Sequence, residues 1–183
     1  MTAGLTTIWL GLLLAWILWG LAALILPGPA AIAAAALSSA VAVWAFRDTL
    51  VLRGVVAVLG SFRVVLAFLV LRHMVTGLGV EVIPFGTVEL VVFVLAYGAF
   101  LATATGTLPA DIYRLGYAPL PVGVMVLAVC GYGMVQGSLF APLVAVAGQA
   151  FWAFRLGSSN WFDHVLHASL IPVALVVLAG RLL

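Results

Sequence analysis

The chain has 183 residues, of which 67% are hydrophobic and only 7% are charged, and its formal net charge is +2. A soluble globular domain is usually about 45–50% apolar and about 25% charged, so these polar side chains are too few to cover a water-facing surface. The composition excludes a soluble enzyme, a nucleic-acid binder, a disordered linker and a disulfide-rich module, and it predicts a polytopic membrane protein.

Long apolar runs predict that residues 1–183 form a single all-α domain. Only helices and closed barrels satisfy every backbone group in lipid, and the runs lack the alternation of a barrel strand. Since about 20 residues cross a bilayer as a helix, the runs favour a bundle of seven transmembrane helices. The predicted spans are about Leu5–Leu26, Ala30–Phe46, Leu50–Leu71, Phe85–Thr103, Leu120–Gln136, Leu139–Phe154 and Trp161–Leu178.

The stretch from Leu120 to Phe154 decides the number of spans. It has about twice the length that one crossing needs, and Gly137, Ser138 and Pro142 lie near its middle. We expect two short helices joined by a tight turn, which makes seven spans. One long tilted helix, which would make six spans, and a re-entrant pair of helices are the alternatives.

The arginines predict the orientation in the membrane, because cytoplasmic loops of membrane proteins carry an excess of Lys and Arg. With seven spans and a cytoplasmic N-terminus, most of the arginines at span ends lie inside: Arg47, Arg53, Arg114 and Arg155. We therefore expect a multi-pass protein of a bacterial-type inner (cell) membrane with its N-terminus inside.

Arg63 and Glu89 form the first candidate site. Each lies inside an apolar run, where a charge costs at least about 2.5–3.5 kcal/mol and needs a partner. In an antiparallel hairpin of the third and fourth spans, the two residues lie at similar depths at ~1.5 Å per residue. The sequence predicts an ion pair, which either stabilises the hairpin or lies on the path of a small solute, ion or proton.

The second candidate site is the segment 160–167, with Asp163, His164 and His167. The two histidines are three residues apart, so they share one face of a helix, and Asp163 could orient an imidazole. The segment is either an interfacial helix start, a proton, quinone or substrate site, or, together with His73, a metal site. His73 lies on the same side of the membrane as His164 only with six spans.

Small and polar residues complete the candidates. Gly133 and Gly137 form a small-x-x-x-small pair, and residues 30–36 are nearly all alanine, so both segments predict close helix packing within the bundle or at a dimer face. Gln136 is a polar residue at the end of an apolar segment and could line a narrow path.

The leading hypothesis is a small transporter or channel for a small solute, ion or proton, with Arg63 and Glu89 near the path and the face from Asp163 to His167 at one mouth. One alternative is an integral subunit of a larger membrane complex, redox-linked or not, or a homo-oligomer. The other is an intramembrane metal-dependent enzyme that uses His164, His167 and Asp163 with His73 or Ser61. The expected partners are the lipid bilayer and a small solute, not a nucleic acid, and no motif identifies a cofactor.

Overall fold

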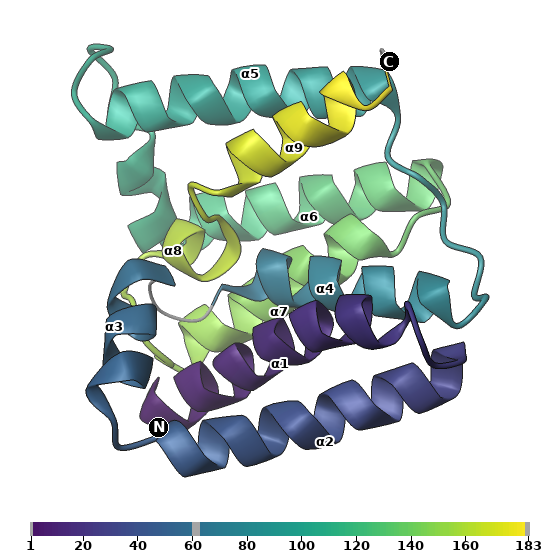
Figure 1. Ribbon diagram of the computed structural model, residues 1–183. Helices are drawn as coiled ribbons and strands as arrows, with labels where there is room; N and C mark the ends of the chain where they lie inside the picture. The colour runs from purple at the N-terminus through teal and green to yellow at the C-terminus, as the bar shows by residue number, and fades with distance from the viewer. Residues whose placement is uncertain (1, 60–62, 182–183) are drawn as a thin grey trace. The chain divides into compact units, whose positions relative to one another are not determined.

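A computed structural model describes residues 2–59 and 63–181, and within these ranges every regular element is helical (Figure 1). The all-α prediction is therefore confirmed for the described residues. The chain divides into two compact units, Met1–Val82 and Ile83–Leu183. The single domain predicted over residues 1–183 stays a prediction, and each unit has its own packing.

Among the described residues, three helices are long and apolar enough to cross a membrane: α1 (Thr2–Ala22), α2 (Gly28–Phe46) and α5 (Thr87–Ala104). The other helical elements in the described ranges are shorter, namely α3 (Leu50–Leu59), α4 (Val64–Gly77), the 3-10 helix η1 (Tyr113–Tyr117), α6 (Pro119–Val135), α7 (Phe140–Ala153), α8 (Trp161–Val165) and α9 (Leu170–Ala179). The seven-span bundle therefore stays a prediction.

In the first unit, α1 and α2 pack closely because α2 presents small side chains to its neighbour. The buried residues of α2 recur every four positions, and three of the four are alanine or serine: Ala31, Ala35, Ser39 and Val43. The Ser39 hydroxyl donates a hydrogen bond to the Gly11 carbonyl of α1 at 2.5 Å. This spacing forms one helix face, and it confirms the close packing predicted for the alanine-rich segment.

Helix α4 completes the core of the first unit. Val70 and Met74 of α4 are buried in one apolar cluster with Trp19 of α1 and with Ala31 and Ala35 of α2. The indole of Trp19 also lies directly against Gly77, where a Cβ atom would collide with the ring. The core of this unit is therefore built from large side chains of α1 seated against small ones.

The continuous third span predicted over Leu50–Leu71 is wrong. Helix α3 ends at Leu59, and α4 begins at Val64 after Arg63, which has extended backbone angles (φ −131°, ψ 127°). The apolar run is long enough for one helix, but the extended backbone of Arg63 interrupts it directly before α4.

In the second unit, α6 and α7 form a hairpin with a tight turn at Gly137. Gly137 has a positive φ of 66°, and the Ser138 amide donates to the Gly133 carbonyl at 2.9 Å. Gly133 packs against Pro142 of α7, where a Cβ atom would collide. The alternative of one long tilted helix is therefore wrong. Gly133 does serve close packing as predicted, whereas Gly137 supplies the turn.

The continuous last span predicted over Trp161–Leu178 is also wrong. Helix α8 ends at Val165, Leu166 is extended (ψ 149°), and α9 begins at Leu170. Pro172 explains the interruption, because proline inside a continuous helix removes a hydrogen bond and clashes with the carbonyl four residues earlier. With the break, Pro172 falls in the first turn of α9, where the clash and the loss are avoided. Helix α9 then lies along α5 (Figure 1).

Candidate functional site

A buried polar network surrounds the start of α8, and Asn160 is its centre. Asn160 is 0% exposed. Its side-chain oxygen accepts from the Phe162 amide at 2.9 Å, and its side-chain nitrogen donates to the Tyr113 carbonyl at 2.9 Å. Asn160 therefore caps α8 and also joins α8 to η1. Gly116 of η1 leaves the necessary space, since a Cβ atom there would collide with the Asn160 side chain.

Asp163 is the carboxylate of this network. Its Oδ2 atom accepts a hydrogen bond from the Tyr113 hydroxyl at 2.9 Å and from the Ser158 hydroxyl at 2.6 Å. Burial, together with the hydrogen bond to Asp163 and its negative charge, raises the pKa of Tyr113 well above the ordinary tyrosine value. Tyr113 therefore stays a proton donor throughout the physiological pH range.

The raised pKa of Tyr113 predicts a loss of stability at alkaline pH. The unfolded chain releases this proton near the ordinary tyrosine pKa of about 10, whereas the folded chain keeps it to higher pH. The stabilising contribution is complete below pH about 10 and is lost as the pH rises above it. Unfolding titrations of the solubilised protein should show stability falling more steeply above this pH in the wild type than in Tyr113→Phe. Identical pH dependence in the two proteins would contradict the assignment.

His164 fastens the loop before α8. Its side chain is 3% exposed, and its Nε2 atom lies 2.8 Å from the Ser158 carbonyl oxygen. A carbonyl oxygen can only accept, so Nε2 carries the hydrogen in this contact. The same loop thus receives a hydrogen bond from His164 and donates one, through the Ser158 hydroxyl, to Asp163.

His167 lies in the break between α8 and α9 and not on the helix of His164. Its Nδ1 atom accepts from the Ser169 amide at 3.1 Å and lies 2.7 Å from the Ser169 hydroxyl. The predicted common helix face of His164 and His167 is therefore wrong, because α8 ends at Val165. Each imidazole has its own set of contacts.

In the described part of the chain, the structure does not bring together the ligands of the metal site that the histidines suggested. Among residues 2–59 and 63–181, no group of three or more His, Cys, Asp or Glu side chains is arranged to hold a metal ion. His73 belongs to the first unit, where its Nδ1 atom accepts from the Trp16 indole at 2.9 Å. Ser61 lies outside the described residues. The metal-dependent enzyme stays a hypothesis from the sequence.

Glu89 lies in the first turn of α5 and not in the middle of a span. One carboxylate oxygen accepts from the Gly86 amide just before the helix at 2.5 Å, and the other accepts from the Tyr132 hydroxyl of α6. Arg181 closes the same end of α5 by donating to the Phe85 carbonyl at 2.6 Å and to the Thr87 hydroxyl at 2.9 Å. Glu89 thus caps α5 and joins it to α6.

Arg63 directly precedes α4 in the first unit, whereas Glu89 belongs to the second. The ion pair between them stays a prediction. Gln136 is the residue that ends α6, and it is exposed. This agrees with its predicted position at the end of an apolar segment, and its role near a path stays a prediction.

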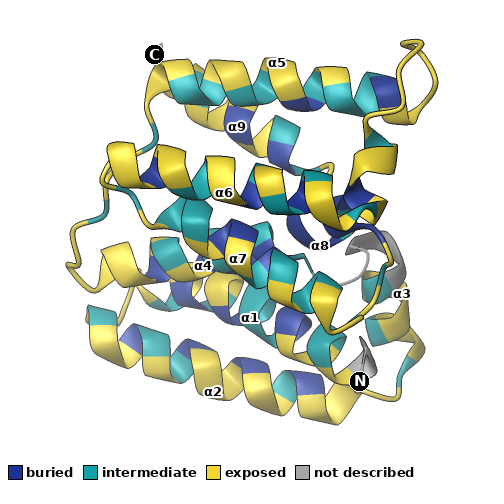
Figure 2. Cartoon of the chain, turned by 180° about the vertical axis from the view of Figure 1, so that it is seen from behind, coloured by how far each residue is buried: buried dark blue, intermediate teal, exposed yellow. Residues whose placement is uncertain are grey.

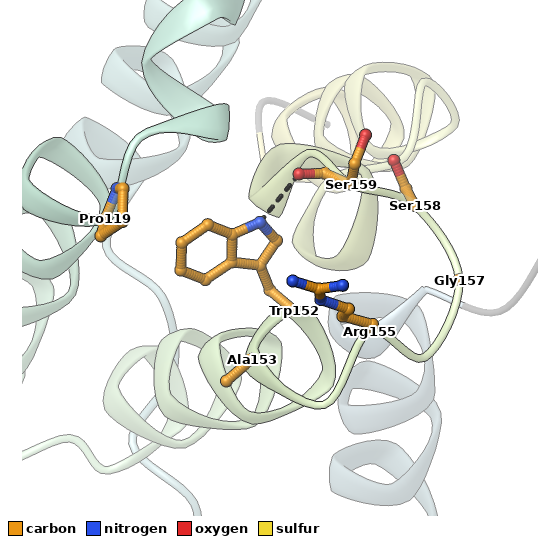
Figure 3. A pocket seen from close by; sticks show the side chains of 7 residues that line it. All are labelled: Pro119, Trp152, Ala153, Arg155, Gly157, Ser158 and Ser159. Atoms are coloured by element: carbon orange, nitrogen blue, oxygen red, sulfur yellow. Dashed lines mark hydrogen bonds between the residues drawn. The ribbon is translucent and has the colours of Figure 1, made fainter.

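A hollow of about 580 Å³ lies beside the polar network at the end of α7 (Figure 3). It is lined by Pro119, Trp152, Ala153, Arg155, Gly157, Ser158 and Ser159. The Trp152 indole forms one wall and donates to the Ser159 carbonyl at 2.8 Å. Ser158 connects the hollow to the network, because the same residue lines the hollow and donates to Asp163.

Sequence reasoning missed several residues of this region. Tyr113 contacts Asp163 across 50 residues of sequence, and no local pattern signals such a contact. Arg155 was interpreted only as a charge that orients the protein in the membrane. Ser158 was also missed, although its hydroxyl donates to Asp163.

Comparisons with known proteins found no relative: no family model matches the chain, and no curated protein or solved structure is significantly similar to it.

Proposed function

We propose that the protein is a multi-pass integral membrane protein of the inner (cell) membrane with its N-terminus inside. The composition and the three long apolar helices support this proposal. Large apolar side chains are strongly exposed, as with Leu24 (81%), Val88 (76%) and Leu95 (67%), and Figure 2 shows exposed residues along the whole of α5. Such surfaces suit lipid better than water. Seven crossings would use α6 and α7 separately and the pairs α3–α4 and α8–α9 as broken spans.

Within this bundle, we propose that the protein moves a small solute, an ion or a proton. The observation that carries the proposal is the polar network buried directly before the break between α8 and α9. Transporters place ionisable side chains at interruptions of membrane helices, because the broken segment leaves polar backbone groups for a substrate. Asp163 and His164 lie directly before this interruption, and His167 lies within it. Ionisable residues within a membrane protein's apolar segments are usually functional.

We propose that Arg63 and Glu89 also lie on the transport path. Arg63 also lies at an interruption, between α3 and α4. Glu89 shares its carboxylate between the start of α5 and Tyr132, so its protonation would alter a contact between two helices. The predicted ion pair of Arg63 with Glu89 remains part of this proposal, with Gln136 near one end of the path.

Flux measurements on reconstituted liposomes test the transport proposal. Glu89→Gln and Arg63→Ala should each lower the flux of the transported species roughly tenfold or more, which corresponds to about 1.4 kcal/mol in the barrier. A pH-sensitive dye inside the liposomes reports protons, and a panel of labelled solutes reports other cargo. Asp48→Asn is the matched control, because Asp48 is exposed and pairs with its sequence neighbour Arg47. Unchanged flux of every solute in both variants would count against the proposal.

The second candidate is a subunit of a larger membrane complex, and the outer face of α5 favours it. Only 11% of the apolar segment of α5 is buried within the chain, whereas 22% of the corresponding segments of α1 and α2 is buried. A neighbouring subunit could cover this face as well as lipid does. Extraction in mild detergent distinguishes a subunit from a separate transporter, because a subunit would leave the membrane together with stoichiometric partners.

A further inference from the structure

Four of the described helices end in a Schellman motif, in which the second residue after the helix has a positive φ and the last amides bond back to carbonyls of the final turn. After α7, the Arg155 amide donates to the Trp152 carbonyl at 3.0 Å, and the Leu156 amide donates to the Phe151 carbonyl at 2.9 Å. The residue with positive φ is glycine after α4, α5 and α6 and arginine after α7: Gly79 (84°), Gly106 (75°), Gly137 (66°) and Arg155 (54°). Glycine is the usual residue there, since a left-handed backbone is unfavourable for a residue with a Cβ atom.

Contacts within the chain do not explain the arginine. Arg155 is exposed, and its guanidinium makes no hydrogen bond or ion pair with the residues that the structure describes. A charge that only orients the protein in a membrane would act equally well elsewhere in the loop, for example at Leu156 or Ser159. An arginine in a backbone conformation that is unfavourable for it points to a function of its side chain.

The side chain of Arg155 lies at the hollow beside α8. Figure 3 shows its guanidinium next to the Trp152 indole, and it is the one charged side chain among the seven residues that line the hollow. A volume of about 580 Å³ falls within the range of small-molecule sites, roughly 300–1,000 Å³. The Ser158 hydroxyl and the Trp152 indole nitrogen are already donating within the chain. Among the side chains that line the hollow, the donors left for a ligand are the guanidinium and the Ser159 hydroxyl.

We propose that this hollow binds a phosphate group, carried either by an anionic phospholipid or by soluble phosphate. A guanidinium presents five N–H donors in a planar fork that matches two phosphate oxygens at once. The Trp152 ring offers an apolar wall for the carbon atoms beside the phosphate. Asp163 does not line the hollow, and its Oδ2 atom is occupied by Tyr113 and Ser158. The site uses none of the ionisable side chains of the transport proposal, because its lining comes from the end of α7, the loop before α8 and Pro119 of α6.

Calorimetric titration of the full-length protein in a neutral detergent tests the site. The probes are a short-chain phosphatidylglycerol and inorganic phosphate, and zwitterionic phosphatidylcholine is the reference lipid. The wild type should bind at least one of the two anionic probes saturably. Arg155→Gly should weaken that binding roughly tenfold or more, because a charge-assisted hydrogen-bonded contact is lost. Arg155→Lys should weaken it less, since the charge remains while the fork is lost.

Two controls make the result decisive. Arg114→Ala removes the same charge from an exposed position outside the hollow and should leave affinity unchanged. Arg155→Gly should also melt about 2–4 °C higher than the wild type, because the strain is relieved, so its weaker binding would not be due to unfolding. Binding of phosphatidylglycerol alone identifies a lipid headgroup, and binding of inorganic phosphate identifies a soluble anion. No saturable binding of either, wild-type affinity in Arg155→Gly, or an equal loss in Arg114→Ala would overturn the proposal.

Discussion

Replacing Asn160 with alanine is expected to lower the free energy of unfolding by about 2–4 kcal/mol, which combines the loss of a helix cap with an unsatisfied buried carbonyl. Asn160 is 0% exposed, so water cannot replace its two hydrogen bonds. Without the side chain, the Phe162 amide loses its acceptor and the Tyr113 carbonyl loses its donor. Unfolding of the purified protein by increasing sodium dodecyl sulfate in mixed micelles measures the change.

Two further variants separate the roles of Asn160. Ser159→Ala is the matched control, because Ser159 is an exposed neighbour and contributes its backbone carbonyl, which the substitution keeps. It should unfold within about 0.5 kcal/mol of the wild type. Asn160→Asp keeps the acceptor for Phe162, loses the donor for Tyr113 and buries a second charge near Asp163. It should be at least as destabilised as Asn160→Ala. Wild-type stability in Asn160→Ala would refute the central role of this residue.

Much of the helical pattern could be predicted from the sequence because proline and glycine mark helix boundaries. The division of the apolar stretch between Leu120 and Phe154 followed from Gly137 and Pro142, and the structure confirms two helices there. Their physical effects are local: glycine tolerates a positive φ, and proline fits only the first turn of a helix. Asn160 and the two serines before it are all favoured helix caps for the same kind of local reason, and the structure assigns the cap of α8 to Asn160.

The interruptions of two predicted spans were missed because hydropathy reports only that a segment is apolar. Leu50–Leu71 and Trp161–Leu178 are both apolar enough for a continuous helix, yet the structure breaks each of them. Pro172 was a local signal for the second break. At the first, Arg63 is extended, and no proline marks the break.

The candidate site was predicted in part, since its residues were found but their contacts were not. Asp163 and His164 were singled out, and the structure places both in one polar network. Their partner Tyr113 lies 50 residues away from Asp163 in sequence, and such contacts depend on tertiary packing. The position of Glu89 in an apolar run suggested a partner far away in sequence. In the structure, the carboxylate of Glu89 accepts from the Gly86 amide, which is only three residues away. A Glu three residues after a helix start often caps it, and this signal was overlooked.

The second large effect is expected at Gly148, where α7 packs directly against α8. A Cβ atom on Gly148 would collide with the Val165 side chain and lie 3.4 Å from the Trp161 indole nitrogen. Val165 and Trp161 are themselves buried, so neither side chain can move aside without displacing others. Gly148→Leu should therefore destabilise the protein by about 2–3 kcal/mol, at the upper end of overpacking costs. The same detergent-unfolding measurement applies.

The matched control for this substitution is Gly98→Leu in α5. Gly98 is also inside a helix, but nothing lies within 4 Å of its Cβ position, so leucine should stabilise the protein by about 0.5–1 kcal/mol through helix propensity. Opposite signs at the two glycines would show that contact with α8, and not the residue type, sets the cost. A double substitution tests the contact between Gly148 and Val165. Gly148→Ala combined with Val165→Ala should lower the free energy of unfolding by less than the sum of the single changes, because Val165→Ala removes the methyl group with which the new Cβ atom would collide. Strict additivity would mean that α7 and α8 separate freely at this point, and the buried network at the start of α8 would then lack its support.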